Sequence, residues 1–522
     1  MITPADPLPD DLETAHQLIR ELLKTLAQQV HLNEKLQHQL EQLLRQRYGP
    51  RTERIDPAQL LLFAREILAQ AEPTPAPAPT PEPDSAPTPR APKKEGHGRK
   101  PLPASLPRQT VVHDVPLERR TCPDCGTERT CIGQEVREQL EYIPASLVVI
   151  EHIRPKYACR ACEANVVIAD RLPEPIEKGL PGPGLLAYVA VSKYADHLPL
   201  YRLEGILRRF DVELSRSTMC DWMAVAAELL EPIVKLMLVR ILSSKVVQND
   251  DTTVPVQDHS GKGIKTGRLW DSIGDHDNPY TVYTYTTDRS AAGPREIFQG
   301  FKGYLQADAC SSYDGLYTSG EIVEVGCMMH ARRKFHEART SDPQRSHQAL
   351  AWIGLLYDVE RDVKGRESDD YEAFVALRHR VRGERSRPIF EKFHAWLEAE
   401  QPKVLPKSPI AEAIGYALNH WEALKRPLEA GFLELDNGAC ERAFKPVALG
   451  RKNWLFAGSD QGAETAAILM SLCTTCKSLG IDPQAYLRDV LGRISTHPAK
   501  RIDELLPDRW QELRRAGDAA PD

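Results

Sequence analysis

The sequence contains no run of about 18 consecutive apolar residues, the length that a membrane-spanning helix requires. Its first residues, MITPADPLPDDLETAHQ, lack the basic start and the apolar stretch of a secretory signal peptide. These absences argue against membrane insertion and export, so we expect a cytoplasmic protein. Thiols stay reduced in that compartment, and closely spaced cysteines then indicate metal ligands or core residues rather than disulfides.

An excess of positive charge is also missing. The 522 residues include 67 Lys and Arg against 74 Asp and Glu, a formal net charge of −7. The overall charge therefore gives no support to nucleic-acid binding, and only local clusters of charge can support it. The length allows several domains with large cores, and a hydrophobic content of 41% is typical of globular proteins. The 41 prolines indicate at least one extended linker.

Apolar residues recur at alternating steps of three and four between Ile19 and Leu43, which predicts a short coiled coil in residues 1–48. Asn33 falls at a core position of this repeat, where a buried amide favours a two-stranded pairing, so we expect self-association. An amphipathic helix packed against its own chain is the alternative. A second helix is expected in residues 49–71.

Residues 72–108 are expected to form a proline-rich tether that ends in a basic arm. Nine prolines fall within residues 72–92, which predicts a semi-rigid spacer. The arm that follows includes Arg99 and Lys100. Such an arm contacts DNA phosphates in some proteins and is a solvated linker in others, and both interpretations stay open.

Two cysteine pairs predict a structural zinc site in residues 109–170. Each pair encloses two residues, and 33 residues that look like two strands separate the pairs, which consist of Cys122 with Cys125 and Cys159 with Cys162. Four thiolates close a tetrahedral site for one Zn²⁺. Reduced core cysteines are the alternative, Cys131 lies outside the pairs, and Lys156 adds a basic side chain nearby. A third pair, Cys473 and Cys476, is expected to pack in the core of a helix.

Residues 171–240 are expected to be helical. Two apolar helical faces flank a short turn, and Ser215 is suited to cap the second helix. Arg216 follows that cap. The arrangement fits a helix-turn-helix that binds DNA and fits a plain packed helical hairpin equally well.

From residue 245 the pattern changes to short strands that end in acidic residues. A β-branched run leads to Asp250, and the segment GYLQAD ends at Asp308. At strand ends, hard carboxylate oxygens could hold two Mg²⁺ or Mn²⁺ ions about 4 Å apart for phosphoryl transfer. Helix caps and surface charge explain many such acids, so that alternative stays open.

Further along, a helix that starts near Asp436 is expected to carry Glu441, with Lys445 one turn away on the same face. A basic residue beside a metal-binding carboxylate can hold a DNA phosphate, and a surface ion pair is the alternative. Asp308 and Glu441 are 133 positions apart, which leaves room for a sizeable helical insertion.

These motifs, in this order, resemble the large transposase (TnpC type) of the insertion sequence sixty-six family, within the DDE transposase superfamily. The segments that carry the resemblance are DDTTVPV from Asp250, GKGIKTGRLW, GYLQAD, GCMMHARRKF, NGACER and GRKNWLFAGSDQGAETAAILMSLCTTCKSLGIDPQAYLRDVL. The family usually has Asp-Glu-Thr where this chain has Asp250, Asp251 and Thr252. The position in the motif favours Asp250 as the ligand.

The resemblance implies a multidomain α/β protein with a ribonuclease-H-like catalytic core. Its catalytic and Mg²⁺-binding triad would be Asp250, Asp308 and Glu441. We expect the core in residues 241–340, a helical insertion in 341–430, completion of the core in 431–463, and a C-terminal helical region in 464–522. A coiled coil and a small zinc-binding domain precede the core.

The resemblance also implies double-stranded DNA as a partner, both transposon ends and target. We expect a homodimer or higher oligomer, accessory proteins of the same element, and association with the bacterial nucleoid when DNA is bound. The candidate DNA contacts are Arg99, Lys100, Lys156, Arg216, His330, Arg332, Arg333, Arg442, Lys445, Arg451 and Lys452. Two rivals remain: a zinc-dependent DNA-binding regulator without catalysis, and a nuclease that cuts without joining.

Overall fold

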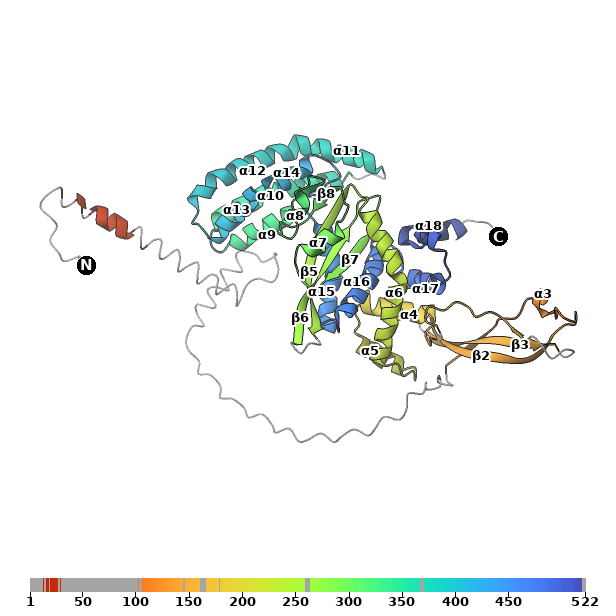
Figure 1. The fold of residues 1–522 in the computed structure, drawn as a ribbon. Helices are drawn as coiled ribbons and strands as arrows, with labels where there is room; N and C mark the ends of the chain where they lie inside the picture. Colours follow the sequence, from red (N-terminus) through yellow and green to blue (C-terminus); the bar gives the residue numbers. More distant parts are fainter. Residues whose placement is uncertain are drawn as a thin grey trace, which may run out of the picture. The chain divides into compact units, whose positions relative to one another are not determined.

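The structure is a computed structural model (Figure 1). It describes residues 106–143, 146–159, 166–177, 179–258, 263–366 and 370–518, together with Leu102 and parts of a helix between residues 13 and 29. Ile19, Leu22 and Leu26 are helical and exposed. Most of the coiled-coil repeat, the second expected helix, the proline-rich tether, Arg99, Lys100 and Cys162 lie outside the described residues.

The chain divides into two compact units. The first includes His330–Trp421, and the second includes Arg99–Met329 and Glu422–Asp522. Among the described residues, no helix combines the length and the apolar character needed to cross a membrane.

A mixed five-stranded sheet with the strand order β7-β6-β5-β8-β9 is the centre of the second unit. Strands β5, β6 and β7 pair antiparallel, whereas β8 and β9 run parallel to β5. Their bounds are β5 Val246–Asp258, β6 Gly263–Ile273, β7 Thr281–Thr286, β8 Gly303–Gln306 and β9 Ile322–Val325. Two short helices, α7 (Ala292–Ile297) and α8 (Asp314–Tyr317), lie in the connections.

Strand β5 differs from the expectation that it would end at its acidic residues. It continues through Asp250 to Asp258, because β6 pairs with it along this whole length. Val254 and Val256 alternate into the core beyond the acids. Asp250 therefore lies in the middle of a strand and not at its end.

Helix α16 (Asp460–Ser478) packs against the edge strand β7, and its hydroxyls pair with the strand's backbone. The amide of Thr281 donates to Oγ1 of Thr475 over 3.0 Å, and the amide of Tyr283 donates to Oγ of Ser471 over 2.8 Å. The Thr475 hydroxyl in turn donates to the carbonyl of Thr281. At Thr281 and at the Tyr283 amide, this edge of the sheet is thus satisfied by side chains. Cys473 and Cys476 are buried in α16, which confirms their expected place in the core.

Further helices of the second unit pack around α16. Helix α6 contacts both α16 and β7, and α4 packs against α17. The bounds are α4 Pro183–Tyr194, α5 Leu200–Arg208, α6 Arg216–Ile241, α15 Gly438–Trp454, α17 Pro483–Arg493 and α18 Pro507–Asp518. The side chain of Ser215 accepts from the amide of Thr218 over 3.1 Å, which confirms the predicted cap of α6.

The first unit contains helices on either side of a short π-helix, Arg382–Ser386. Their bounds are α10 Pro343–Lys364, α11 Tyr371–Val381, α12 Arg387–Glu400 and α13 Pro409–Asn419, while α9 (Met328–Ala338) and α14 (Trp421–Lys425) cross the boundary between units. Glu360 is buried between two arginines of this unit. Its carboxylate lies 2.7 Å from Nη2 of Arg378 and 2.7 Å from Nε of Arg382.

The buried carboxylate of Glu360 is expected to hold the first unit together. Burial alone would raise its pKa, but the hydrogen bonds and charges of Arg382 and Arg378 outweigh burial and hold the pKa below its usual value. Glu360→Gln leaves two buried guanidinium groups without a counter-charge and should lower the free energy of unfolding by about 3–5 kcal/mol in urea denaturation. This stabilisation should be complete above pH 4.5 and should be lost as the pH falls through the lowered pKa.

The matched control is Glu391→Gln, at an exposed position of α12, which should change the free energy of unfolding by less than about 0.5 kcal/mol. Equal stability of the two variants would contradict the role of the buried cluster.

Candidate active site

The parallel register of β5 and β8 brings two of the predicted acids together. Gln248 pairs with Gln306, so that Asp250 and Asp308, each two residues further along, emerge side by side. The amide of Gln306 ties this register to the rest of the unit, because its Nε2 donates to the carbonyl of Glu434 over 2.8 Å. The sheet therefore places Asp250 and Asp308 next to each other.

Helix α15 carries the third predicted acid, Glu441, in its first turn. Asn437 precedes the helix and donates from Nδ2 to the carbonyl of Asn249 over 3.4 Å, beside Asp250. The hydroxyl of Tyr283 donates to the carbonyl of Ala443 over 2.5 Å. These bonds attach the start of α15 to β5 and β7, and the positive end of the helix dipole favours negative charge there.

The three carboxyls influence one another electrostatically. Burial, followed by the negative charge of Asp308, raises the pKa of Asp250 to about 7, and Glu441 contributes in the same direction. Among the described residues, carboxyl oxygens of these three acids do not all lie within 4.8 Å of one another. Oxygen ligands of this kind suit hard divalent cations, whose charge would relieve the repulsion among the carboxyls.

Asp251, the residue that departs from the family pattern, has a different environment. Its side chain is fully buried and forms ion pairs with Arg268 over 2.8 Å and with Arg289 over 2.6 Å. Two guanidinium groups thus balance this carboxylate, which leaves it no need of a metal ion. Asp250 thus stays the predicted ligand.

Two residues that the sequence-based prediction missed support the site. Asp271 is completely buried opposite Asp250, and its Oδ1 accepts from the amide of Asp250 over 2.9 Å. Arg289 connects Asp251 to Asp308, from which its Nη2 lies 3.4 Å away. An acid within the apolar strand segment RLWDSI is the sequence signal that could have identified Asp271. Arg289 lies in a loop and has no comparable signal.

Several predicted DNA contacts fall on α15. Arg442, Lys445 and Lys452 are exposed, whereas Arg451 donates to Oγ1 of Thr252 over 3.2 Å. The remaining described candidates are dispersed: Arg216 is exposed at the start of α6, Lys156 is half-buried on β3, and His330, Arg332 and Arg333 lie on α9 in the first unit. These roles stay predictions.

The predicted zinc module forms around a long hairpin. Strands β2 (Thr130–Ile143) and β3 (Ser146–Ala158) pair antiparallel, β1 (Arg108–Val112) and β4 (Val167–Ile168) add to β3, and α3 spans Leu117–Arg120. The hairpin pairs Thr130 with Ala158, which brings Cys159 close to the first cysteine pair. Two strands between the cysteine pairs are what the sequence predicted.

Ligand atoms of Cys122, Cys125 and Cys159 all lie within 4.8 Å of one another, and the Sγ atoms of Cys125 and Cys159 are 3.3 Å apart. Gly126 closes the first knuckle with a φ of +69°, and its amide donates to the carbonyl of Cys122 over 2.9 Å. Cys131 lies outside this cluster. Three thiols in this geometry fit a tetrahedral zinc site.

Residues 178–465 match the family model described as Transposase IS66 family. The match covers more than half of the chain and includes the three acids. The chain belongs to the IS66 transposase family. The resemblance that the motifs carry is thereby confirmed.

Three further models match other parts of this IS66 transposase. They are the zinc-finger binding domain of transposase IS66 at residues 119–163, the IS66 C-terminal element at 471–507, and the Transposase C of IS166 homeodomain at 35–111. The first includes all four predicted zinc ligands. Zinc-finger and homeodomain matches in a transposase imply that the chain binds DNA.

The chain is also similar to curated proteins of Sinorhizobium fredii (strain NBRC 101917 / NGR234) that are described as uncharacterized. The protein y4jD is 32% identical across 92% of this chain and 98% of its own length. The proteins y4qI and y4hP are 38% and 34% identical, each across 80% of this chain and 78% of their own lengths.

Asp250→Asn and Asp251→Asn should have opposite effects on the stability of the metal-free IS66 transposase. At pH 8, Asp250→Asn should raise the melting temperature, because it removes a buried charge that Asp308 repels. The gain should shrink below about pH 7, where the Asp250 carboxyl is protonated. Asp251→Asn should lower the melting temperature, since two arginines lose their buried partner.

The change in melting temperature on addition of Mg²⁺ distinguishes a metal ligand from a residue with a structural role. Mg²⁺ should stabilise the wild type and Asp251→Asn against heat but not Asp250→Asn. The reverse pattern would identify Asp251 as the ligand.

Proposed function

We propose that this IS66 transposase cleaves transposon ends and joins the freed 3′-hydroxyl to target DNA by metal-dependent phosphoryl transfer. The observation that carries the proposal is the convergence of Asp250, Asp308 and Glu441 from two parallel strands and one helix. Family membership supports DNA as the substrate. Both steps displace an oxygen in line at phosphorus, so one site can serve both.

The donor set fits two Mg²⁺ or Mn²⁺ ions. Asp250, Asp308 and Glu441 would hold them through carboxylate oxygens. Such ions, when bound, activate the attacking oxygen and stabilise the leaving oxygen. The Asp250 carboxyl, whose pKa is about 7, would release its proton as a cation binds.

Neighbouring residues hold these carboxyls in place. Asp271 orients the backbone of Asp250, and Asn437 anchors the helix of Glu441. Arg289, about two-fifths exposed beside Asp308, is placed to donate to a phosphate oxygen of the DNA. The side chain of Arg289 would thus contact the substrate at the metal-binding edge.

The sheet supports a ribonuclease-H-like assignment for the core. An antiparallel meander, β5 to β7, continues into two parallel strands. Asp250 lies on the central strand β5, and Asp308 follows two residues after the neighbouring strand β8. Helices α10–α13 follow in sequence before Glu441, as the proposed insertion requires.

Other proposed functions rest on the flanking modules. The zinc module, the α5–α6 pair with Arg216, and the basic residues of α15 would bind double-stranded DNA. Two ends must be brought together, so we propose a homodimer or higher oligomer formed through the N-terminal coiled coil. Accessory proteins of the same element would complete the assembly.

The decisive test is incubation of the purified chain with Mg²⁺ and labelled duplexes taken from the DNA flanking its gene. The wild type should nick at an element end and join that end to a target. Asp308→Asn and Glu441→Gln should each lower the rate at least 100-fold, since each removes a ligand of the transferring metals. Gel separation of cleaved and joined strands measures both steps.

Each negative outcome identifies one rival. Cleavage without joined product would favour a nuclease. Specific binding without cleavage, after addition of the element's other proteins, would favour a DNA-binding regulator.

The zinc assignment has its own test. Reduced protein should contain about one zinc per chain, and Cys159→Ser should lower this content well below one, because it removes a ligand of a closed four-thiolate site. Cys131→Ser, at an exposed cysteine outside the cluster, should keep it. Elemental analysis by mass spectrometry measures the content. A wild-type chain purified without zinc would contradict the site.

A further inference from the structure

A strained turn follows directly after helix α15. Leu455 has a φ of +64° and a ψ of −51°, and the amide of Phe456 donates to the carbonyl of Trp454 over 2.8 Å. This is a γ-turn with positive φ at its centre, a rare and unfavourable conformation for a leucine. The Leu455 side chain is 63% exposed, so burial in the core does not explain the strain.

The surrounding backbone holds this turn in place. The amide of Ala457 donates to the carbonyl of Pro255 over 2.9 Å, and the amide of Gln257 donates to the carbonyl of Ala457 over 2.8 Å. The chain after the turn is therefore attached to the far end of β5. Strain maintained in this way, at an exposed apolar side chain, is typical of a functional position.

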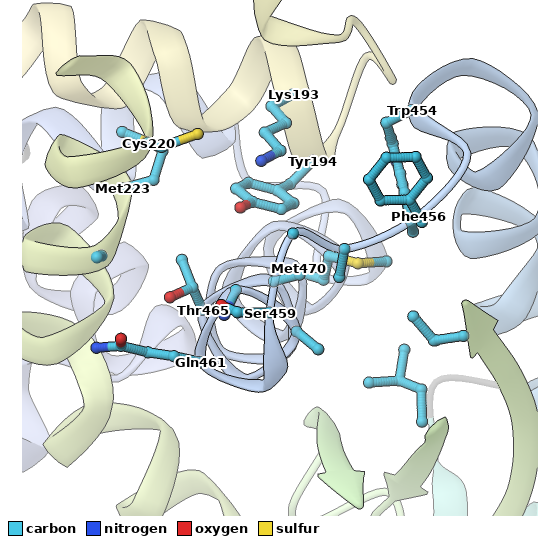
Figure 2. Close-up of a pocket in the computed structure, with 18 of the residues that line it drawn as sticks. Lys193, Tyr194, Cys220, Met223, Trp454, Phe456, Ser459, Gln461, Thr465 and Met470 are labelled. Carbon is cyan, nitrogen blue, oxygen red and sulfur yellow. Dashed lines mark hydrogen bonds between the residues drawn. The ribbon is translucent and has the colours of Figure 1, made fainter. Parts of the chain in front are cut away.

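A cavity of about 370 Å³ lies beside the turn. In Figure 2, Trp454 and Phe456 lie on the side opposite Cys220 and Met223, with the ring of Tyr194 between them. Polar groups at its wall can hydrogen-bond a ligand, and they come from Lys193, Asp221, Ser459, Gln461 and Thr465. Aromatic rings together with a few hydrogen-bonding groups suit a flat heterocycle.

Helix α15, whose Val447 and Trp454 line the cavity, indicates which heterocycle the cavity would accept. Lys445 and Lys452 are exposed along α15, the helix that also carries Glu441. Phosphates of a DNA strand would be attracted to this helix. Glu441 and Trp454 are 13 residues apart, about 20 Å along a helix at 1.5 Å per residue. That distance equals about six base pairs at 3.4 Å each.

We propose that this cavity binds one nucleobase unstacked from the transposon end, about six base pairs from the cleaved phosphate, while Leu455 fills the space that the base leaves. The proposal rests on the proposed function, because it takes an element end as the substrate. An apolar side chain can enter a base step and displace one base, and aromatic rings nearby can then stack on that base. Stacking on aromatic rings accepts any base.

Binding to a series of element-end duplexes, each with a single abasic nucleotide, tests the proposal. With the full chain, one position or two adjacent ones should bind about tenfold more tightly than the intact duplex, because the cost of unstacking is absent there. Fluorescence anisotropy measures the affinities.

Substitutions then identify the residues involved. Leu455→Ala should weaken binding to the intact duplex about tenfold, and the abasic duplex should restore wild-type affinity. Ala224→Phe, which fills the cavity from α6, should remove the preference for the abasic position. Leu449→Ala, at a half-exposed leucine of α15, is the matched control and should change nothing.

Equal affinities for the intact duplex and for every abasic duplex, in a chain that still cuts element ends, would overturn the cavity proposal alone. Equal weakening of intact and abasic duplexes by Leu455→Ala would also overturn it. A chain that neither binds nor cuts element ends would overturn the proposed function as well.

Discussion

The accumulation of negative charge along the middle of β5 is the constraint on which the site depends. Asp250, Asp251, Asp271 and Asp308 lie within one short stretch of the sheet, and each is stabilised differently. Two arginines neutralise Asp251, whereas the nearby charge of Asp308 raises the pKa of Asp250. The charge of Asp250 has no such compensation, and the proposed cation site is placed there for that reason.

The local sequence predicted the helices, strands and cysteine knuckles more accurately than the contacts between distant residues. The β-branched runs identified the strands, the cysteine spacing identified the knuckles, and Ser215 identified the start of α6, because each depends on residues close in the chain. Asp250 was expected at a strand end, since its acidic neighbours look like a terminus. Pairing with β6, a contact between distant residues, carries β5 eight residues further.

The contacts that distinguish one acid from the next are also long-range. The motif indicated Asp250, but only folding brings Arg289 to Asp251 and Asp308, since the arginine comes from a loop without a pattern. The role of Asp271 could not be predicted from the local sequence either. Its role depends on the register between two strands, which the alternation of residues in either strand leaves undetermined.

The hydroxyls of α16 have a consequence for how copies of this protein can meet. Exposed strand edges commonly recruit a strand from another molecule. Here Thr475 already occupies the amide and the carbonyl of Thr281, and Ser471 occupies the amide of Tyr283. The outer strand thus offers no template at these residues for sheet extension. Contacts among copies at this edge would have to form through helical surfaces, which can separate again when a transposition complex is taken apart.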